Sequence, residues 1–140
     1  MPATDEGARV AKLSLIVFSG DFAKVHYALA AAAAAAAIDI HATLFFTMEA
    51  SRALTKDEGW HALADNPADS DAALRARNVA SFTELLESCH KLGVRFLVCS
   101  MGLTAIDLAE EALRDDLDIK ISGLVAFLKD AHADGSVVFV

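Results

Sequence analysis

Eight consecutive alanines, Ala30 to Ala37, limit what this chain can fold into more than any other feature of its sequence. Alanine has the highest helix propensity, so the segment from Phe22 to Ala37 predicts a helix about 24 Å long at 1.5 Å per residue. Small side chains give such a helix a flat surface for close packing. A low-complexity tract is the alternative interpretation. Because the alanines lie between two strand-like segments, we interpret them as a crossover helix lying on a sheet.

Short apolar runs alternate with helical spacing along the rest of the chain. We expect strands at residues 13–18, 38–46, 94–98 and 136–140, and a short strand or extended segment at 119–121. Further helices are expected at 47–54, 75–92, 103–113 and 124–131. This alternation predicts one α/β domain over residues 1–140, an open doubly wound and mainly parallel sheet with helices on both faces.

One long polar stretch, from Thr55 to Asp71, interrupts this alternation. A loop of this length in a compact domain is usually either a lid or mobile, so we expect a mobile cover over the strand ends. Trp60 would then anchor the cover over a pocket. The alternative is that Trp60 only packs the loop onto the body of the domain.

Charge and hydropathy exclude several classes of partner. Twelve Lys and Arg against twenty Asp and Glu give a net charge of −8, which would repel a nucleic-acid backbone. The longest weakly polar stretch, Val25 to Ile38, is shorter than the roughly 20 residues that span a bilayer. The segment from Met1 to Glu6 lacks the basic and apolar regions of a signal peptide, so we expect a cytoplasmic protein.

The same apolar excess predicts self-association. Mean hydropathy is +0.40, and a chain of this size buries only about two thirds of its unfolded surface as a monomer. Some of the apolar surface would therefore meet another subunit, and we expect a homo-oligomer, dimer or trimer.

Two expected strands end in residues that could carry chemistry, because sites in such sheets form at the carboxyl ends of strands. Cys99 follows the apolar strand at 94–98 and precedes a helix, whose N-terminus would lower the pKa of the thiol. A small core residue is the alternative interpretation. Cys89, on the apolar stripe of a helix with Val79 and Phe82, is interpreted as an inert core residue.

The other strand end is Ser19-Gly20-Asp21, followed by Lys24. Asp21 would cap the alanine helix, and Lys24 with nearby backbone N–H groups would line a pocket into which Cys99 points. Both roles could hold together. The glycine-rich nucleotide motifs and the serine-hydrolase elbow are missing, and the cysteine and histidine spacings fit no zinc site. We therefore expect no metal and no cofactor.

Several of these segments together resemble the DsrE/DsrF-like sulfur-relay family, and more specifically its peroxiredoxin-like branch. They are residues 13–21 (Leu-Ser-Leu-Ile-Val-Phe-Ser-Gly-Asp), the alanine-rich helix, residues 43–47 (Thr-Leu-Phe-Phe-Thr), residues 92–101 ending in Val-Cys-Ser-Met, residues 123–128 and the closing strand. The chain departs from this branch at Gly102-Leu103 and Ile106-Asp107. The resemblance implies a flavodoxin-like domain that assembles into oligomers and carries sulfur as a persulfide on Cys99.

The functional prediction is a sulfur relay in which Cys99 accepts sulfane sulfur and passes it to another thiol. Its partners would be sulfur donor and acceptor proteins or low-molecular-weight persulfides. The pocket around the thiol is predicted to consist of residues at three strand ends: Ser19, Gly20, Asp21, Lys24, Thr47, Ser100 and Met101. Two alternatives stay open, a non-catalytic module that binds a small ligand or another subunit, and a thiol peroxidase.

Overall fold

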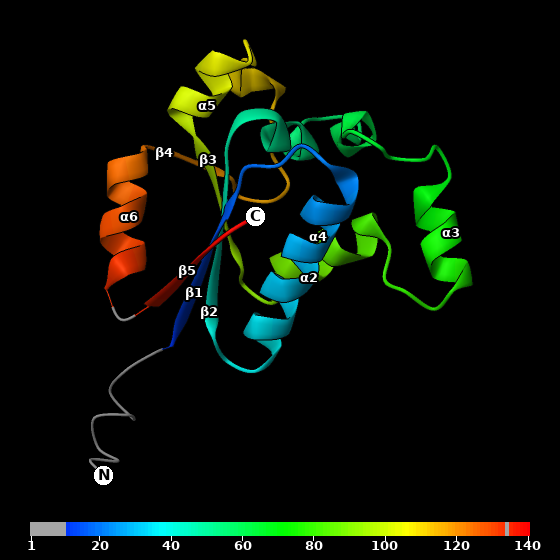
Figure 1. The fold of residues 1–140 in the computed structure, drawn as a ribbon, viewed down its shortest axis with the longest axis horizontal. Coiled ribbons are helices and arrows are strands. Elements are labelled where there is room, and N and C mark those ends of the chain that lie inside the picture. Colours follow the sequence, from blue (N-terminus) through cyan, green and yellow to red (C-terminus); the bar gives the residue numbers. More distant parts are fainter. Residues whose placement is uncertain (1–10, 134) are drawn as a thin grey trace.

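A five-stranded, all-parallel sheet forms the centre of the protein, seen in a computed structural model that describes residues 11–133 and 135–140 (Figure 1). The strands are β1 (Lys12–Val17), β2 (His41–Phe46), β3 (Arg95–Cys99), β4 (Lys120–Ser122) and β5 (Gly135–Phe139). Their order across the sheet is β4-β3-β2-β1-β5. The predicted α/β class is confirmed, and every expected strand is present within a few residues of its predicted bounds. The prediction about Met1 to Glu6 lies outside the described residues.

Helices cover both faces of the sheet (Figure 1). The α-helices are α2 (Phe22–Ala37), α3 (Ser70–Ala76), α4 (Phe82–Lys91), α5 (Ser100–Ala105) and α6 (Leu124–His132), and the 3-10 helices are η1 (Met48–Leu54), η2 (Gly59–Ala62) and η3 (Glu110–Ala112). The helices α2 and α4 lie on one face and α6 lies on the other. The alanine-rich helix α2 has the predicted bounds, and Asp21 caps it by accepting a hydrogen bond from Lys24 N at 3.3 Å.

The sheet separates two apolar cores, because successive residues of a strand point to opposite faces. The larger core lies under α2 and α4 and includes Leu15, Leu29 and Phe46. The smaller core lies under α6 and consists of Phe45, Leu97, Cys99, Phe127 and Ala131, with Ile16 packed against it. The rings of Phe45 and Phe127 stack at 4.3 Å and join α6 to the sheet.

The helix expected over 75–92 begins later than predicted, because residues 77–81 interrupt it: only its first two residues belong to α3, and the rest of the helical part is α4. Asn78 has a positive φ of 60° and ends the first helical segment, and Ser81 begins the second with a capping box. In this box Ser81 Oγ accepts from Glu84 N at 3.1 Å, and Ser81 N donates to Glu84 Oε1 at 3.0 Å. Val79 therefore lies between the helices and is exposed, which corrects its predicted place on the buried stripe.

The helix expected over 103–113 begins earlier and is short. The helix α5 covers Ser100–Ala105 and is followed by a turn in which Asp107 has a φ of 55°. Leu108 N donates to Leu103 O at 3.0 Å, which closes the helix end. Only the 3-10 turn η3 remains of the predicted second half.

The segment from Thr55 to Asp71 is packed onto the body of the domain. Trp60 lies in η2, is buried, and stacks on Phe82 at 4.8 Å. Ala64 exchanges two backbone hydrogen bonds of 2.9 Å with the turn before α2, donating to Gly20 O and accepting from Phe22 N. The expected mobile cover is therefore not supported, and the alternative, that Trp60 packs the segment onto the domain, is confirmed.

Candidate functional site

The order of the strands places a crevice between the ends of β1 and β5. The chain leaves β1 toward β2 on one side and returns as β5 on the other side. In open parallel sheets, ligands bind outside the carboxyl ends of strands at such a switch point. An open cleft of about 960 Å³ lies there, lined by Phe18, Ser19, Gly20, Lys24, Met48, Glu49, Ile106, Phe139 and Val140.

One wall of the cleft joins the first and last strands. Phe18 and Phe139 stack with ring centroids 5.5 Å apart. The backbone N–H groups of Phe18 and Ser19 both donate to Val140 O, at 2.9 and 3.1 Å. This wall is mainly apolar, and Lys24 adds a cationic side chain from the first turn of α2.

A strained residue follows β2 at the same edge. Met48 has a φ of 51°, a backbone conformation that residues other than glycine rarely adopt. Met48 also lines the cleft. Glycines pack closely on either side of this segment. A Cβ on Gly20 would lie 2.7 Å from Glu49 Cβ, and one on Gly102 would meet Thr47 Oγ1 and lie 2.6 Å from Met48 N. The glycines therefore allow three strand ends to approach one another.

Cys99 is the last residue of β3 and the residue that precedes α5, as predicted, but its side chain is only 2% exposed. It lies in the smaller core with Phe45, Leu97 and Phe127, beneath α6. The alternation along β3 explains this position, since Cys99 and Leu97 are two residues apart and point to the same face.

The predicted pocket residues divide into two groups. Ser19, Gly20 and Lys24 line the cleft, whereas Cys99 does not. Lys24 belongs to α2, which covers the face opposite to the smaller core, so the expected approach of Lys24 to the Cys99 thiol is not seen. Asp21 serves as the helix cap.

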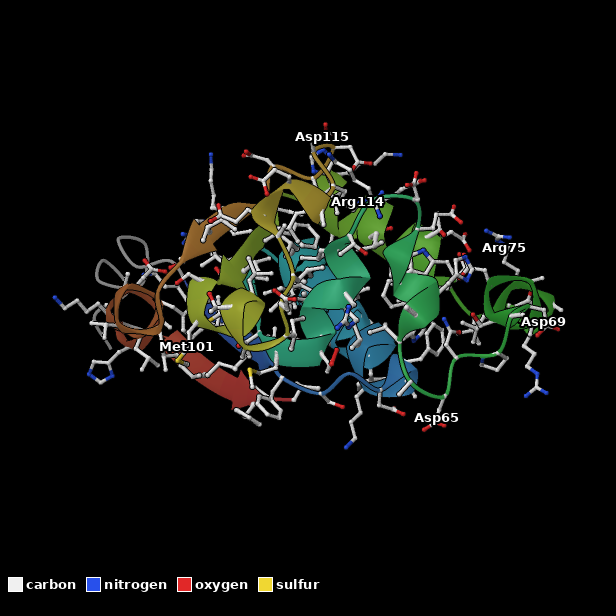
Figure 2. The ribbon with its side chains drawn as sticks, turned by 90° about the horizontal axis from the view of Figure 1, so that it is seen from above. Asp65, Asp69, Arg75, Met101, Arg114 and Asp115 are labelled. Atoms are coloured by element: carbon white, nitrogen blue, oxygen red, sulfur yellow. The ribbon has the colours of Figure 1, made fainter. Side chains whose placement is uncertain are left out.

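The remaining predicted residues directly follow β2 and β3. Thr47 is buried and donates its backbone N–H to Val17 O at 3.0 Å. Ser100 and Met101 form the exposed first turn of α5. Figure 2 shows Met101 at the end of the molecule where α5, α6 and β5 come together.

Sequence reasoning did not find two thirds of the residues that line the cleft: Phe18, Met48, Glu49, Ile106, Phe139 and Val140. Two of them, Phe139 and Val140, could be found only from the pairing of β5 with β1. The sequence patterns place a strand at the end of the chain but do not say which neighbour it takes.

Cys89 lies in the larger core, across the sheet from Cys99. Its Sγ donates to Leu29 O at 3.3 Å, and burial raises the pKa of the thiol to about 12. Cys89 is thus the buried helix residue that the apolar stripe predicts. Because the sheet separates the two thiols, a disulfide between them within one chain would require the fold to open.

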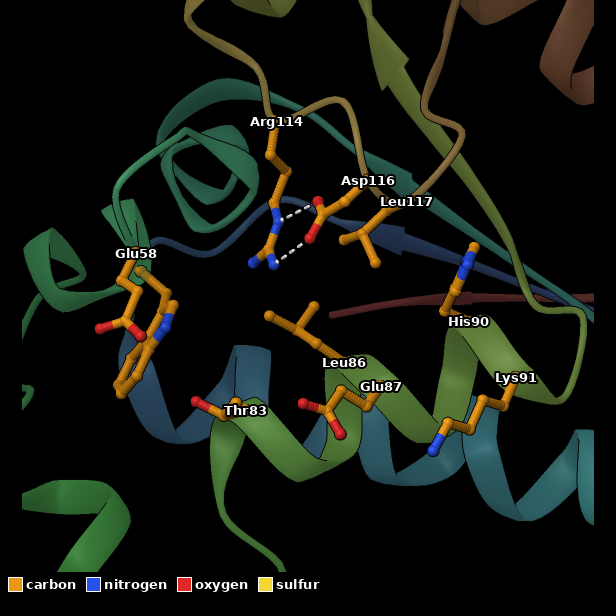
Figure 3. A pocket seen from close by; sticks show the side chains of 10 residues that line it. Glu58, Thr83, Leu86, Glu87, His90, Lys91, Arg114, Asp116 and Leu117 are labelled. Carbon is orange, nitrogen blue, oxygen red and sulfur yellow. Dashed lines mark hydrogen bonds and ion pairs between the residues drawn. The ribbon is translucent and has the colours of Figure 1, made fainter.

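A second hollow of about 150 Å³ lies between α4 and the segment from Arg114 to Leu117 (Figure 3). Two of its charged residues are paired, because Arg114 donates two hydrogen bonds to Asp116 at 2.8 and 2.9 Å. This pairing raises the pKa of Arg114 and lowers that of Asp116. Arg114 and Asp116 in this hollow therefore bind each other.

Residues 11–133 and 135–140 offer a place for neither a metal site nor a membrane span. Within these ranges no three His, Cys, Asp or Glu side chains are grouped so that they could hold a metal ion. Likewise, none of the helices there is long and apolar enough to cross a membrane.

The protein is thus a small α/β domain with a parallel sheet. It has a cleft at the switch point of the sheet and a cysteine at the end of a strand. Residues 12–139 match the DsrE/DsrF-like family, and the chain belongs to that family. It is 27% identical to the uncharacterized protein YrkE of Bacillus subtilis (strain 168) over an alignment 153 positions long, which covers 90% of this chain and 94% of that protein.

The fold is also similar to a solved structure, that of a protein of unknown function, MTH1491, from Methanobacterium thermoautotrophicum. The TM-score is 0.65 at 12% sequence identity, with 93% of this chain and 99% of that chain covered. Proteins of the DsrE/DsrF-like family are generally sulfur-relay proteins.

Proposed function

We propose that this protein carries sulfane sulfur as a persulfide on Cys99 and passes it to a partner thiol. The observation that carries the proposal is the position of Cys99 at the carboxyl end of β3, in a chain that belongs to a family of sulfur-relay proteins. The other thiol, Cys89, is sealed in the larger core and its raised pKa keeps it protonated at neutral pH.

The transfer consists of two exchange steps. The Cys99 thiolate attacks the outer sulfur of a donor persulfide, a new bond forms to Cys99 Sγ, and the donor S–S bond breaks. The electron pair leaves on the donor thiolate. An acceptor thiolate then attacks the outer sulfur of the Cys99 persulfide in the same way, so the relay has no net oxidation. Donor and acceptor would be sulfur-transfer proteins or low-molecular-weight persulfides.

Burial of Cys99 determines which donors can react. A side chain that is 2% exposed beneath α6 offers little room for a bulky reagent. Small polysulfides should therefore load the folded protein much faster than an aromatic disulfide reagent does. In the unfolded protein, where both thiols are exposed, this preference should disappear.

The test is the intact mass of the reduced protein after exposure to polysulfide. We expect one reductant-reversible sulfur per chain, retained in Cys89→Ser and lost in Cys99→Ser. Loading that survives Cys99→Ser but not Cys89→Ser would place the nucleophile on α4. If neither cysteine of the reduced wild type is loaded, the relay proposal fails.

A second candidate function is supported by the cleft itself. The cleft is lined mainly by apolar side chains, with Ser19, Lys24 and Glu49 as its polar side chains, and Cys99 is not among its lining residues. A small-ligand-binding module would use this cleft and leave the cysteine in a structural role. Under that hypothesis Cys99→Ser retains ligand binding and Lys24→Ala weakens it. A thiol peroxidase is less well supported, because Cys89 lies across the sheet and cannot resolve a sulfenic acid on Cys99.

A further inference from the structure

The cleft at the switch point of the sheet has the size and the lining of a small-molecule site. Its volume of about 960 Å³ is at the upper end of the range of ligand pockets, roughly 300–1,000 Å³. Phe18 and Phe139 form one wall, and their stacked rings remain 45% and 67% exposed. Met48, from η1, and Ile106, which follows α5, add aliphatic side chains to the lining. The cleft can therefore hold the apolar body of a ligand.

The acceptor groups around the cleft are already occupied. Glu49 lines the cleft and is paired with Arg52, three residues further along η1. The carboxylate of Asp21 is not part of the lining, and it accepts from Lys24 N as the cap of α2. The oxygen of Val140 accepts from two backbone N–H groups of the β1 end. Each of these acceptors therefore has a donor within the protein.

The donor groups of the cleft differ in this respect. Lys24 is exposed, and none of the ion pairs within residues 11–133 and 135–140 includes its ammonium group. Gly20 also lines the cleft, and its backbone N–H donates to no acceptor in the described part of the chain. The cleft thus presents unmatched donors, one of them a cation, although the chain has a net charge of −8.

From these observations we infer that the cleft binds a small amphipathic anion. Its carboxylate or sulfonate would bind Lys24, and its flat apolar body would lie against Phe18 and Phe139. Charge-assisted hydrogen bonds to acidic oxygens are roughly twice as strong as neutral ones, and aromatic rings favour offset stacking with a planar body. A cationic ligand would place its charge beside Lys24, and a neutral ligand would gain nothing from that charge.

The inference rests on the second candidate function, because it gives the ligand class for the cleft of that module. It is independent of the sulfur relay, since Cys99 does not line the cleft and lies in the smaller core under α6. Ligand binding to the cleft and sulfur loading of Cys99 are separate measurements, and either of them can fail alone.

The test uses two fluorescent probes that share an aromatic body. Anilinonaphthalene sulfonate is an anion, and N-phenylnaphthylamine lacks the sulfonate. Each probe is titrated into the full chain as the wild type, Lys24→Gln, Phe139→Ala and Val125→Ser. Val125 is the control position, because it is 70% exposed on α6 and does not line the cleft. Circular dichroism checks that each variant is folded.

We expect the wild type to bind the sulfonate at a saturable site, about tenfold or more tightly than the neutral probe. Lys24→Gln should raise the Kd of the sulfonate about tenfold and leave the Kd of the neutral probe unchanged. Phe139→Ala should weaken the binding of both probes, because both lose the same ring contact. Val125→Ser should change neither affinity.

Equal affinity of the wild type for the two probes, or no saturable binding of the sulfonate, would overturn the inference. A sulfonate affinity that Lys24→Gln leaves unchanged would overturn it too, since the anion would then bind elsewhere. So would a loss of binding in Val125→Ser but not in Phe139→Ala, because the probe would then lie on α6. If Phe139→Ala does not fold, Phe18→Ala, on the same wall, takes its place.

Discussion

Alkaline pH should weaken the folded state through Cys89. The thiol is neutral when protonated, and burial in the larger core raises its pKa from 9.0 to about 12. The folded protein therefore holds this proton more tightly than the unfolded chain does. The resulting stabilisation is fully present below about pH 9 and is lost as the pH rises toward 12.

The size of the effect follows from the two pKa values. The interval from 9.0 to about 12 corresponds to about 4 kcal/mol of unfolding free energy at 1.36 kcal/mol per pH unit. At about pH 10.5 roughly half of it, about 2 kcal/mol, should already be lost relative to neutral pH. Lysine and tyrosine titrations also change the stability in this range, so the contribution of Cys89 must be isolated by comparison.

The assay is urea unfolding of the wild type and of Cys89→Ala between about pH 7 and pH 10.5. The substitution leaves a small cavity that lowers the stability at every pH, and this offset cancels in the pH dependence. We expect the wild type to lose about 2 kcal/mol more than the variant over this range. Parallel pH profiles would refute the reasoning, because they would mean that the Cys89 thiol ionises as easily in the fold as outside it.

Three further predictions concern packing and capping, each measured by urea unfolding. Gly102→Ala should cost about 1–3 kcal/mol because its Cβ would meet Thr47 and Met48, while Gly123→Ala, with open space around the new Cβ, should cost less than about 1 kcal/mol. Ser81→Ala should cost about 1 kcal/mol through loss of the capping box. Phe127→Ala should cost about 3–5 kcal/mol and accelerate alkylation of Cys99 by removing its cover; an unchanged alkylation rate would contradict this.

Local sequence patterns predict much of this fold for physical reasons. The strands are short apolar runs that need only their own residues to be recognised, and α2 follows from alanine propensity and the Asp21 cap. The sequence also contains the signals for the break in the helix expected over 75–92. Asn78 adopts a left-handed conformation that ends a helix, and Ser81-x-x-Glu84 is a capping box that begins one. The apolar residues Val79, Phe82 and Cys89 have helical spacing across this break, and they therefore led to the prediction of one continuous helix.

The composition of the site depends on relations that a single sequence does not contain. Which strand lies beside β1 determines that Phe139 and Val140, rather than Cys99 and Ser100, line the cleft. The direction of Cys99 depends on the register of β3, which places it opposite Ser122 and on the α6 side with Leu97. A strand-end position thus predicts the edge of the sheet but not the face.

The two thiols lie on opposite faces of the sheet and have different surroundings. Cys89 fills the larger core, where its sulfur has a hydrogen-bond acceptor and the burial that keeps it protonated. Cys99 lies in the smaller core, which is closed mainly by Phe127 of α6, a helix with two buried residues. A reagent can reach the thiol on this side only when α6 moves away from the sheet. Access to Cys99 is therefore expected to depend on how firmly α6 packs on the sheet, and a variant that loosens this packing should be alkylated faster at Cys99 than the wild type.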